Sequence, residues 1–393
     1  MTTFLNPKGF EQDPNCANDS RDSWLILGNI QAAKRENNTK RAYVLVNSHQ
    51  AKHIPISPDI ALNQFEQLGD FVASKIRNEK ILVIGFAETA TAIGAGVASK
   101  FTDACYCHTT RMVLPKENRL VFFEEEHCHA PKQMLYSSFS QSKCKEFDRI
   151  IFVEDEITTG KTIGNFLKEL KQKSIFRTDI KISIASIVNN CKSIDKSIEE
   201  AQYYYLAKLG DVDFSEKLES FTQFSADVGY SDSKQPVEFT DIHGCMNPRL
   251  GVNMKSYIEA CEKLSGTILK RYDFEDKDVL ILGTEEFMYP PLIVGRNLLK
   301  TARTTRVHAT TRSPIMPCKE YRYDYEYPYP LFSRYALKSV YPGQYQTYIY
   351  NLKKYDVVLV ITDSACENIG IKQLHGALQN AGNDNIITVR WME

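Results

Sequence analysis

The sequence of 393 residues lacks a large net charge, a long apolar run and a regular cysteine pattern. Its 48 basic residues nearly cancel its 49 acidic residues, so we expect no binding to nucleic acid or to acidic membranes. No apolar stretch approaches the length of a membrane span, and the first ten residues lack the apolar core of a secretory signal. The ten cysteines follow no disulfide framework. We therefore expect a cytoplasmic protein with reduced thiols, long enough for two domains.

The spacing of a typical zinc site is also absent. Six candidate ligands lie close together in the sequence: Cys105, Cys107, His108, His127, Cys128 and His129. A zinc site usually shows C-x-x-C or H-x-x-x-H spacing, and adjacent residues of a strand point to opposite faces. We expect these side chains to be packing and loop residues, with a metal site as the less favoured alternative.

The most informative stretch is R-I-I-F-V-E-D-E-I-T-T-G-K-T (149–162). Its apolar run 150–153 predicts a buried strand that ends in Glu154 and Asp155. The small residues 158–162 predict a tight loop leading into a helix. A helix N-terminus offers backbone N–H groups and a positive dipole to a phosphate, and α/β sheets bind ligands where their strands end. The stretch therefore predicts a phosphate-binding site.

A second loop of the same type precedes this one. The run 80–85 predicts another buried strand, and the small residues after Gly85 lead into a helix. Such a loop alone is weak evidence, because close packing of a helix on a strand also favours small residues. Because this loop precedes the 158–162 loop by one β-α-β unit in the sequence, we expect the two loops to lie side by side in the sheet. The order of elements predicts an α/β domain with a mostly parallel sheet.

The residues before these strands are less informative. Residues 1–22 are polar and predict a poorly ordered arm, and short apolar runs predict strands over 24–30 and 42–47. Lys52 and His53 follow in a loop. They are candidates for contact with a substrate, and equally residues of a solvated turn.

The second half of the chain repeats landmarks of the first half in the same order. The matching pairs are 278–283 with 80–85, 307–312 with 107–111, and 355–364 with 147–156. This order indicates a duplication, with two independent sheets as the alternative. The second copy keeps one aspartate, Asp363, but lacks the T-T-G-K-T loop. We predict a second α/β domain that does not bind the ligand of the first.

A tyrosine-rich stretch lies in this second half. Residues 321–335 alternate tyrosines with charged residues, a composition suited to stacking on a planar base or a partner surface. Tyr325 and Arg312 are the candidates for contact with a base. An irregular packed loop at the domain interface is the slightly favoured alternative.

The run V-E-D-E-I-T-T-G-K-T (153–162) resembles the phosphoribosyl pyrophosphate (PRPP) motif of type I phosphoribosyltransferases. More narrowly, the chain resembles the orotate-phosphoribosyltransferase-like proteins of tellurium-resistance operons, whose C-terminal domain is named for a T-R-S-P motif. The matching segments are Q-A-K-H-I-P-I-S-P (50–58), G-F-A-E-T-A-T-A-I-G (85–94), H-T-T-R (108–111), E-E-H-C-H-A (125–130) and T-R-S-P (311–314).

The resemblance implies an architecture. The type I phosphoribosyltransferase fold, a mostly parallel sheet with flanking helices and a hood, would be followed by a degenerate Rossmann-like α/β domain. The expected divisions are an arm over 1–22, a phosphoribosyltransferase domain over 23–235 and a TRSP-type domain over 236–393.

The resemblance also implies transfer of a phosphoribosyl group from PRPP to a base. Glu154 and Asp155 would hold the ribose hydroxyls, stabilise positive charge at C1 and help to hold Mg²⁺, largely through PRPP. The 5′-phosphate would bind to Thr158, Thr159, Gly160, Lys161 and Thr162. The pyrophosphate would bind to Phe86, Ala87, Glu88 and Thr89.

The polar excursion 112–133 occupies the position of the mobile hood in such enzymes. Arg111, Lys116 or Arg119 would clamp the leaving pyrophosphate as the hood closes and excludes water.

The acceptor is the open part of this interpretation. Hypoxanthine-type enzymes carry an aspartate at the position of Thr158, so an orotate-like or unusual base is favoured here. Glu156 is expected to point to solvent. The expected partners are PRPP and a small-molecule base, with a homodimer as one candidate assembly, and the product would serve tellurium or stress resistance. The alternative is a regulatory protein that senses PRPP or a nucleotide without turnover.

Overall fold

The computed structural model describes residues 13–17, 26–36, 43–115, 119–123, 133–191, 198–209, 214, 218–219, 227–233, 235–318, 333–342, 345–365 and 369–393. All structural statements concern these residues. None of the helices formed by them is both long and apolar enough to cross a membrane.

The first half is built on a six-stranded sheet. In spatial order its strands are β11 (Val252–Asn253), β4 (Cys105–His108), β3 (Ile81–Gly85), β7 (Arg149–Ile157), β8 (Lys181–Asn189) and β9 (Gln202–Lys208). All neighbours are parallel except the short β11 at the edge. The apolar parts of β3 and β7 are buried on both faces, as in a parallel sheet covered by helices. The predicted α/β fold class with parallel sheets is confirmed.

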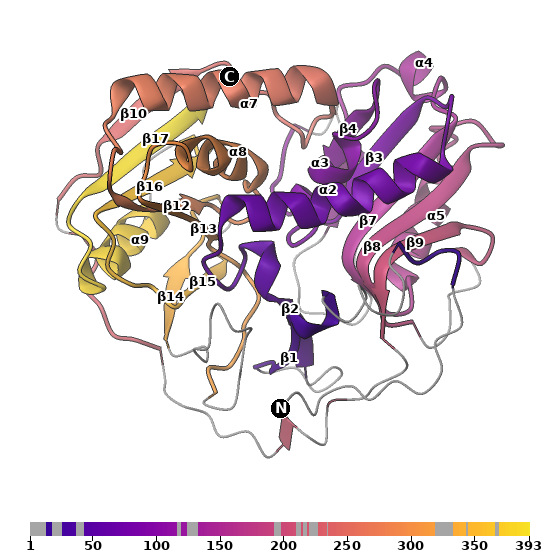
Figure 1. Cartoon of the computed structure of the whole chain (residues 1–393). Helices are drawn as coiled ribbons and strands as arrows, with labels where there is room; N and C mark the ends of the chain where they lie inside the picture. The colour runs from indigo at the N-terminus through magenta and orange to yellow at the C-terminus, as the bar shows by residue number, and fades with distance from the viewer. Residues whose placement is uncertain are drawn as a thin grey trace.

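The second half contains a five-stranded, fully parallel sheet. Its spatial order is β10 (Phe239–His243), β17 (Ile386–Met392), β16 (Val357–Thr362), β12 (Asp278–Gly283) and β13 (Thr304–Ala309). The helices of the first half are α2 (Pro58–Lys75), α3 (Thr91–Ala98), the short α4 (Gln141–Cys144) and α5 (Lys161–Gln172) among the described residues. Those of the second half are α7 (Met254–Arg271), α8 (Tyr289–Leu298) and α9 (Ile369–Asn380). Figure 1 shows the two sheets side by side, with α2, α3 and α8 between them.

The two halves share one topology. The order β4-β3-β7-β8 in the first sheet corresponds to β13-β12-β16-β17 in the second. Each half inserts an antiparallel hairpin at the same point of the chain: β5 (Arg119–Phe123) with β6 (Gln133–Tyr136), and β14 (Arg334–Lys338) with β15 (Gln346–Tyr350). The landmarks repeated in the sequence therefore occupy equivalent places in the two sheets.

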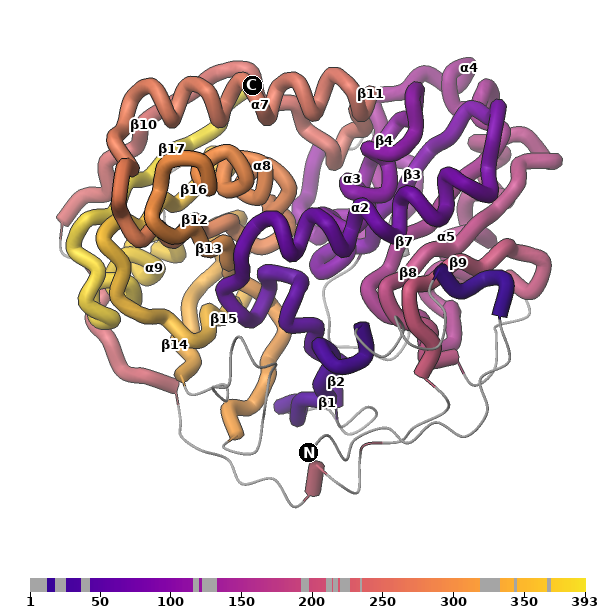
Figure 2. Tube along the Cα trace, in the orientation of Figure 1, coloured from indigo at the N-terminus to yellow at the C-terminus, as the bar shows by residue number. Residues whose placement is uncertain are grey.

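The halves also exchange short segments at their edges. Ile56, just before α2, forms an antiparallel bridge with Val307 of β13, so the first half extends the second sheet. In return β11, just before α7, pairs with Cys105 and Tyr106 of β4. Figure 2 shows α2 and α7 running across both halves from these points. The two sheets are thus joined by backbone hydrogen bonds as well as by packing.

The N-terminal part differs from its prediction. Residues 26–28 are helical, and the strand expected over 24–30 begins only at Ile30. A short apolar run does not by itself distinguish a helix from a strand. The observed β1 (Ile30–Lys34) and β2 (Tyr43–Asn47) form a separate antiparallel pair.

A close helix contact in the first half gives a stability prediction. A Cβ atom at Gly96 of α3 would lie 2.5 Å from the Cβ atom of Phe65 in α2. We expect Gly96→Ala to lower the free energy of unfolding by about 1–3 kcal/mol, because overpacking displaces the helices. Gly266 of α7 has no neighbour within 4 Å of its built Cβ position. Gly266→Ala should therefore raise stability by up to about 1 kcal/mol. Chemical denaturation would compare them; an unchanged Gly96→Ala would contradict the expected overpacking.

Candidate active site

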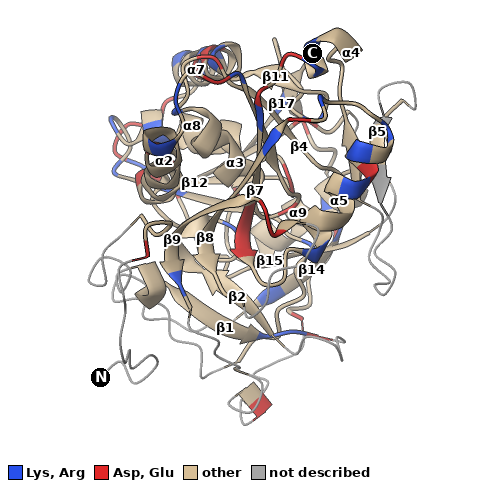
Figure 3. Ribbon diagram, turned by 90° about the vertical axis from the view of Figure 1, so that its right-hand side faces the viewer, with Lys and Arg blue, Asp and Glu red and all other residues tan. Residues whose placement is uncertain are grey.

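The acidic end of β7 lies beside the loop that follows β3. The N–H of Phe86 donates to the carbonyl of Val153 at 3.0 Å, which continues the β3–β7 pairing beyond Gly85. Farther along this loop, the Thr89 side chain lies close enough to Asp155 to lower the pKa of its carboxyl. The end of β7 is red in Figure 3. The two loops expected to be neighbours therefore meet at Asp155.

Asp155 is held in an unfavourable electrostatic environment. Burial raises the pKa of this carboxyl, and the charge of Glu156 raises it further, while Thr89 opposes the change. The sequence predicts that Glu156 points to solvent. In the structure its side chain is half-buried and accepts a hydrogen bond from Asn190 Nδ2 at 3.0 Å. Glu154 is likewise half-buried at the strand end. The three acids therefore follow one another at the end of β7, where successive side chains of a strand point to alternate faces.

The loop after β7 ends in a helix N-terminus suited to an anion. Gly160 is the N-cap of α5 with φ +68°, a backbone conformation that favours glycine. A Cβ atom there would also lie 2.2 Å from Ile198 Cδ1. No side chain of the described residues caps α5, although Lys161 N–H donates to Thr159 Oγ1 at 3.3 Å. The start of this twelve-residue helix can therefore bind a phosphate.

The loop after β3 divides into an anchored part and an exposed part. Phe86 packs against Phe152 and Phe166, and its N–H is bonded to β7. The N–H of Ala87 donates to Thr109 Oγ1 at 2.8 Å. The Ala87–Glu88 peptide bond is cis. Of the four residues predicted to bind pyrophosphate, Phe86 and Ala87 therefore have their amides engaged within the protein.

The side chain of Glu88 is bound by the ammonium group of Lys52 and by the backbone of Arg312. Lys52 Nζ lies 2.6 Å from Glu88 Oε1, and the backbone N–H of Arg312 donates to both carboxylate oxygens at 3.3 and 3.2 Å. Burial alone would raise the pKa of Glu88, but the charges of Lys52 and Arg312 outweigh it and lower the pKa. Glu88 is therefore ionised. Lys52 and Arg312, predicted as acceptor contacts, lie against this loop.

His53 lies beside them without a charge. Its side chain is buried, with its ring centroid 5.7 Å from that of Tyr350. Burial lowers the pKa of His53 to about 3, so the ring is neutral at physiological pH.

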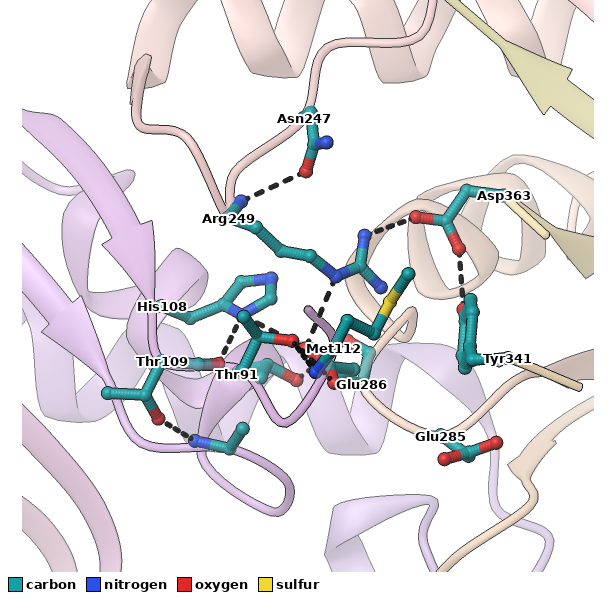
Figure 4. A network of polar contacts seen from close by, with 12 residues as sticks. Thr91, His108, Thr109, Met112, Asn247, Arg249, Glu285, Glu286, Tyr341 and Asp363 are labelled. Carbon is teal, nitrogen blue, oxygen red and sulfur yellow. Dashed lines mark hydrogen bonds and ion pairs between the residues drawn. The ribbon is translucent and has the colours of Figure 1, made fainter. Parts of the chain in front are cut away.

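A network of buried charges continues from Glu88 into the second half. Arg312 Nε donates to Glu285 Oε2 at 2.6 Å, and Arg249 Nε donates to Glu286 Oε2 at 3.3 Å. From the first half, Thr110 Oγ1 donates to Glu286 Oε1 at 2.9 Å. Figure 4 shows Arg249 between Glu286 and Asp363. The two halves therefore share one polar interface.

In the second half, Asp363 and the described part of α9 contact other segments of the protein. Asp363 accepts hydrogen bonds from Arg249 and from the hydroxyl of Tyr341. The Ser364 hydroxyl donates to the carbonyl of Val340 at 2.7 Å. A Cβ atom at Gly370, near the start of α9, would lie 2.4 Å from the carbonyl oxygen of Ser339. Residues 338–341 thus fill this region.

The hood is described only in part. Arg111 directly follows the β4 region and is half-buried, and Arg119 begins β5. Lys116 and Tyr325 lie outside the described residues, as do His127, Cys128 and His129. Cys105, Cys107 and His108 are buried in β4.

Arg249 was not singled out from the sequence. It lies in an ordinary loop, and no local motif marks it. The duplication offered a signal: Arg249 precedes α7 much as Lys52 precedes α2, and each pairs with a glutamate of its own half.

The environment of Asp155 gives a second stability prediction. Because its pKa is raised in the folded state, ionisation above the ordinary aspartate pKa of 3.8 destabilises the protein without ligand. We expect Asp155→Asn to raise the midpoint of thermal unfolding at pH 7. The difference should shrink as the pH falls and disappear well below 3.8, where the carboxyl is protonated in both states. A lower midpoint for the variant at pH 7 would contradict this account.

Comparison with known proteins was made on the sequence and on the fold. Among solved structures, adenine phosphoribosyltransferase from Thermoanaerobacter pseudethanolicus is 15% identical, covering 48% of this chain and 99% of that chain with a TM-score of 0.32. The enzyme from Giardia lamblia, complexed with 9-deazaadenine, is 11% identical, covering 48% and 97% with a TM-score of 0.35. These scores carry no argument about substrate. No curated protein matches the chain.

Two family models match in succession. The model described as "Phosphoribosyl transferase" matches residues 30–227, just over half of the chain. The model described as "TRSP domain C terminus to PRTase_2" matches residues 247–378. The chain therefore belongs to this family of phosphoribosyltransferases, with a TRSP domain after the transferase domain.

Proposed function

We propose that the protein transfers the phosphoribosyl group of PRPP, with Mg²⁺, to an orotate-like or otherwise unusual base. The observation that supports this proposal is the backbone hydrogen bond from Phe86, in the loop after β3, to Val153, the residue before Glu154 in β7. It supports a single site formed by the pyrophosphate loop, the two acids and the phosphate loop of the PRPP motif. One PRPP molecule spans these three elements.

The residues after β7 bind the sugar phosphate. The uncapped start of α5, with Gly160 in its left-handed conformation, receives the 5′-phosphate through backbone N–H groups. Thr158, Thr159 and Thr162 add hydroxyls. Glu154 and Asp155 bind the ribose hydroxyls and stabilise the positive charge that develops on the ring as pyrophosphate leaves.

The loop after β3 binds the pyrophosphate. Since the amides of Phe86 and Ala87 are engaged, those of Glu88 and Thr89 are the proposed donors. The Glu88 carboxylate alone would repel an anion, but this carboxylate is bound by Lys52 and by the N–H of Arg312. Arg111, with Lys116, closes over the leaving group and excludes water.

The acids at the end of β7 fit a magnesium ion. Mg²⁺ is held by one or two carboxylates together with substrate phosphates, and Glu154 and Asp155 supply two adjacent carboxylates. Within the described part of the chain no group of three or more acidic, histidine or cysteine side chains forms a metal cage. When bound, the ion neutralises the charge of the pyrophosphate.

The proposed acceptor contacts are Lys52 and His53, in the segment before α2, and Arg312 and Tyr325, in the second half. The Lys52 side chain is bound to Glu88 and the Arg312 side chain to Glu285, so both act on the base only indirectly. Tyr325 is the remaining proposed contact, with buried His53 beside Lys52. We place the reaction in the cytoplasm and its product in resistance to tellurium or other stress, as the family resemblance implies.

Binding of PRPP tests the site itself. Asp155→Asn removes a charged acceptor for a ribose hydroxyl, so its affinity for PRPP with Mg²⁺ should fall by about tenfold or more. Glu156→Gln removes the same charge one residue farther along and should not weaken binding. Isothermal titration calorimetry would compare both variants with the wild type. Equal affinity of Asp155→Asn and wild type would end the proposal.

Turnover separates an enzyme from a sensor. The family assignment favours catalysis, so we expect the wild type to release pyrophosphate from PRPP when the correct base is present in a panel that includes orotate. The measurement is coupled detection of pyrophosphate. Tight binding of PRPP with no release for any base would favour the alternative, a regulatory protein that senses PRPP.

A further inference from the structure

The loop after β3 is held by hydrogen bonds on both sides of its proposed pyrophosphate donors. Before them, the N–H of Ala87 donates to Thr109 Oγ1 at 2.8 Å. After them, Gln50 Nε2 donates to the carbonyl of Thr89 at 2.8 Å. The N–H groups of Glu88 and Thr89 lie between these two anchors. A loop fixed on both sides presents its amides in one orientation, which lowers the entropic cost of binding an anion.

The anchor at Thr109 also reaches the hairpin β5–β6 of the hood. Thr109 Oγ1 donates to Gln133 Oε1 at 3.1 Å, while it accepts from the N–H of Ala87. Gln133 begins β6, and the next residue, Met134, exchanges two backbone hydrogen bonds with Thr110 at 2.8 and 2.9 Å. Thr109 has no exposed surface and Gln133 is 9% exposed. A buried chain of two side-chain hydrogen bonds therefore joins the hairpin to the loop.

The second half repeats the anchor of the loop. The N–H of Glu285, two residues after β12, donates to Thr310 Oγ1 at 3.0 Å. The backbone N–H of Thr310 donates to the carbonyl of Gly283 at 3.2 Å, as that of Thr109 donates to the carbonyl of Gly85 at 2.9 Å. Thr310 is therefore the counterpart of Thr109.

The second half does not repeat the link to the hairpin among its described residues. Thr311 and Tyr348 exchange backbone hydrogen bonds as Thr110 and Met134 do, so Thr347 is the counterpart of Gln133. The Thr347 hydroxyl donates instead to the carbonyl of Lys338, within its own hairpin, at 3.4 Å. The shared fold therefore does not require the link, which occurs on the side of the PRPP motif.

We infer that Thr109 and Gln133 are positioning residues that orient the pyrophosphate-binding loop from the hairpin of the hood. The inference rests on the proposed PRPP site. Because the Thr109 hydroxyl has a single proton and gives it to Gln133, a lone pair of its oxygen faces the N–H of Ala87. Both residues act on the ligand only through the loop.

Two ligands that divide the proposed site test the inference on the full chain by isothermal titration calorimetry. Inorganic pyrophosphate with Mg²⁺ engages the loop after β3, whereas ribose 5-phosphate engages the end of β7 and α5. We expect Thr109→Val to weaken pyrophosphate binding by about threefold to tenfold and to change ribose 5-phosphate binding by less than about twofold. Thr109→Ser keeps the hydroxyl and should restore the affinity for pyrophosphate.

A second variant tests the part of the chain that lies in the hairpin. Gln133→Met keeps the length of the side chain but removes the acceptor, so pyrophosphate binding should weaken by about twofold to fivefold. The double variant Thr109→Val, Gln133→Met should bind pyrophosphate within about twofold of Thr109→Val alone, because Gln133 acts through the Thr109 hydroxyl. Gln133→Met also repeats the test should Thr109→Val not fold, since it leaves the Ala87 bond in place.

Thr310→Val is the matched control. Thr109 and Thr310 are both buried, and each substitution leaves one backbone N–H without its acceptor, so both variants should lose similar stability in thermal unfolding. The Glu285 carbonyl accepts from Lys52, so a general disturbance of the interface would appear in this control as well. We expect Thr310→Val to bind both ligands within about twofold of the wild type.

The expected pattern is selective weakening of pyrophosphate by the Thr109 and Gln133 variants. Equal pyrophosphate affinity of the wild type and Thr109→Val overturns the inference and leaves the proposed function standing. Equal weakening of both ligands, or of pyrophosphate by both threonine variants, also overturns it, because either result indicates a purely structural contact. Additive losses in the double variant overturn the action of Gln133 through Thr109. A wild type that binds neither pyrophosphate nor PRPP overturns the proposed function and, with it, this inference.

Discussion

The ion pair between Glu88 and Lys52, completed by the N–H of Arg312, is the interaction on which the rest of the structure depends. Lys52 has no exposed surface, so leaving either charge without its partner would cost several kcal/mol. This requirement keeps three distant parts of the chain together: the segment before α2, the loop after β3 and the T-R-S-P segment of the second half. The candidate active site and the interface between the halves therefore share this ion pair.

The two halves repeat the same architecture but differ at the ends of their corresponding strands. The same strand order and the same inserted hairpin occur twice. In the second half the acid at the strand end accepts hydrogen bonds from Arg249 and Tyr341, and residues 338–341 fill the region beside α9. In the first half burial and the charge of Glu156 raise the pKa of Asp155. The corresponding acids of the two halves therefore lie in different electrostatic environments.

Local sequence predicted the elements of the site, whereas it could not predict their partners. The strand ending in Glu154 and Asp155, the glycine at the start of α5 and the neighbouring loop all follow from periodicity and turn chemistry within 15 residues or so. The contact of Glu88 with Arg312 joins residues 224 positions apart, and no local rule specifies it. For the same reason, the sequence analysis assigns Lys52 either to contact with the substrate or to a solvated turn. Its burial depends on both sheets being in place.

The two strand ends also differ in what binds the charged groups at the interface. Asp363 is bound within the second half by Arg249 and Tyr341, whereas Glu286 accepts from Thr110 of the first half, and Glu88 accepts from the N–H of Arg312. Each of these contacts buries a carboxylate, and removing a partner would leave that charge unpaired in a poorly solvated place. The interface therefore constrains the loops of both halves at once, and the T-R-S-P segment takes part in that constraint through the backbone of Arg312.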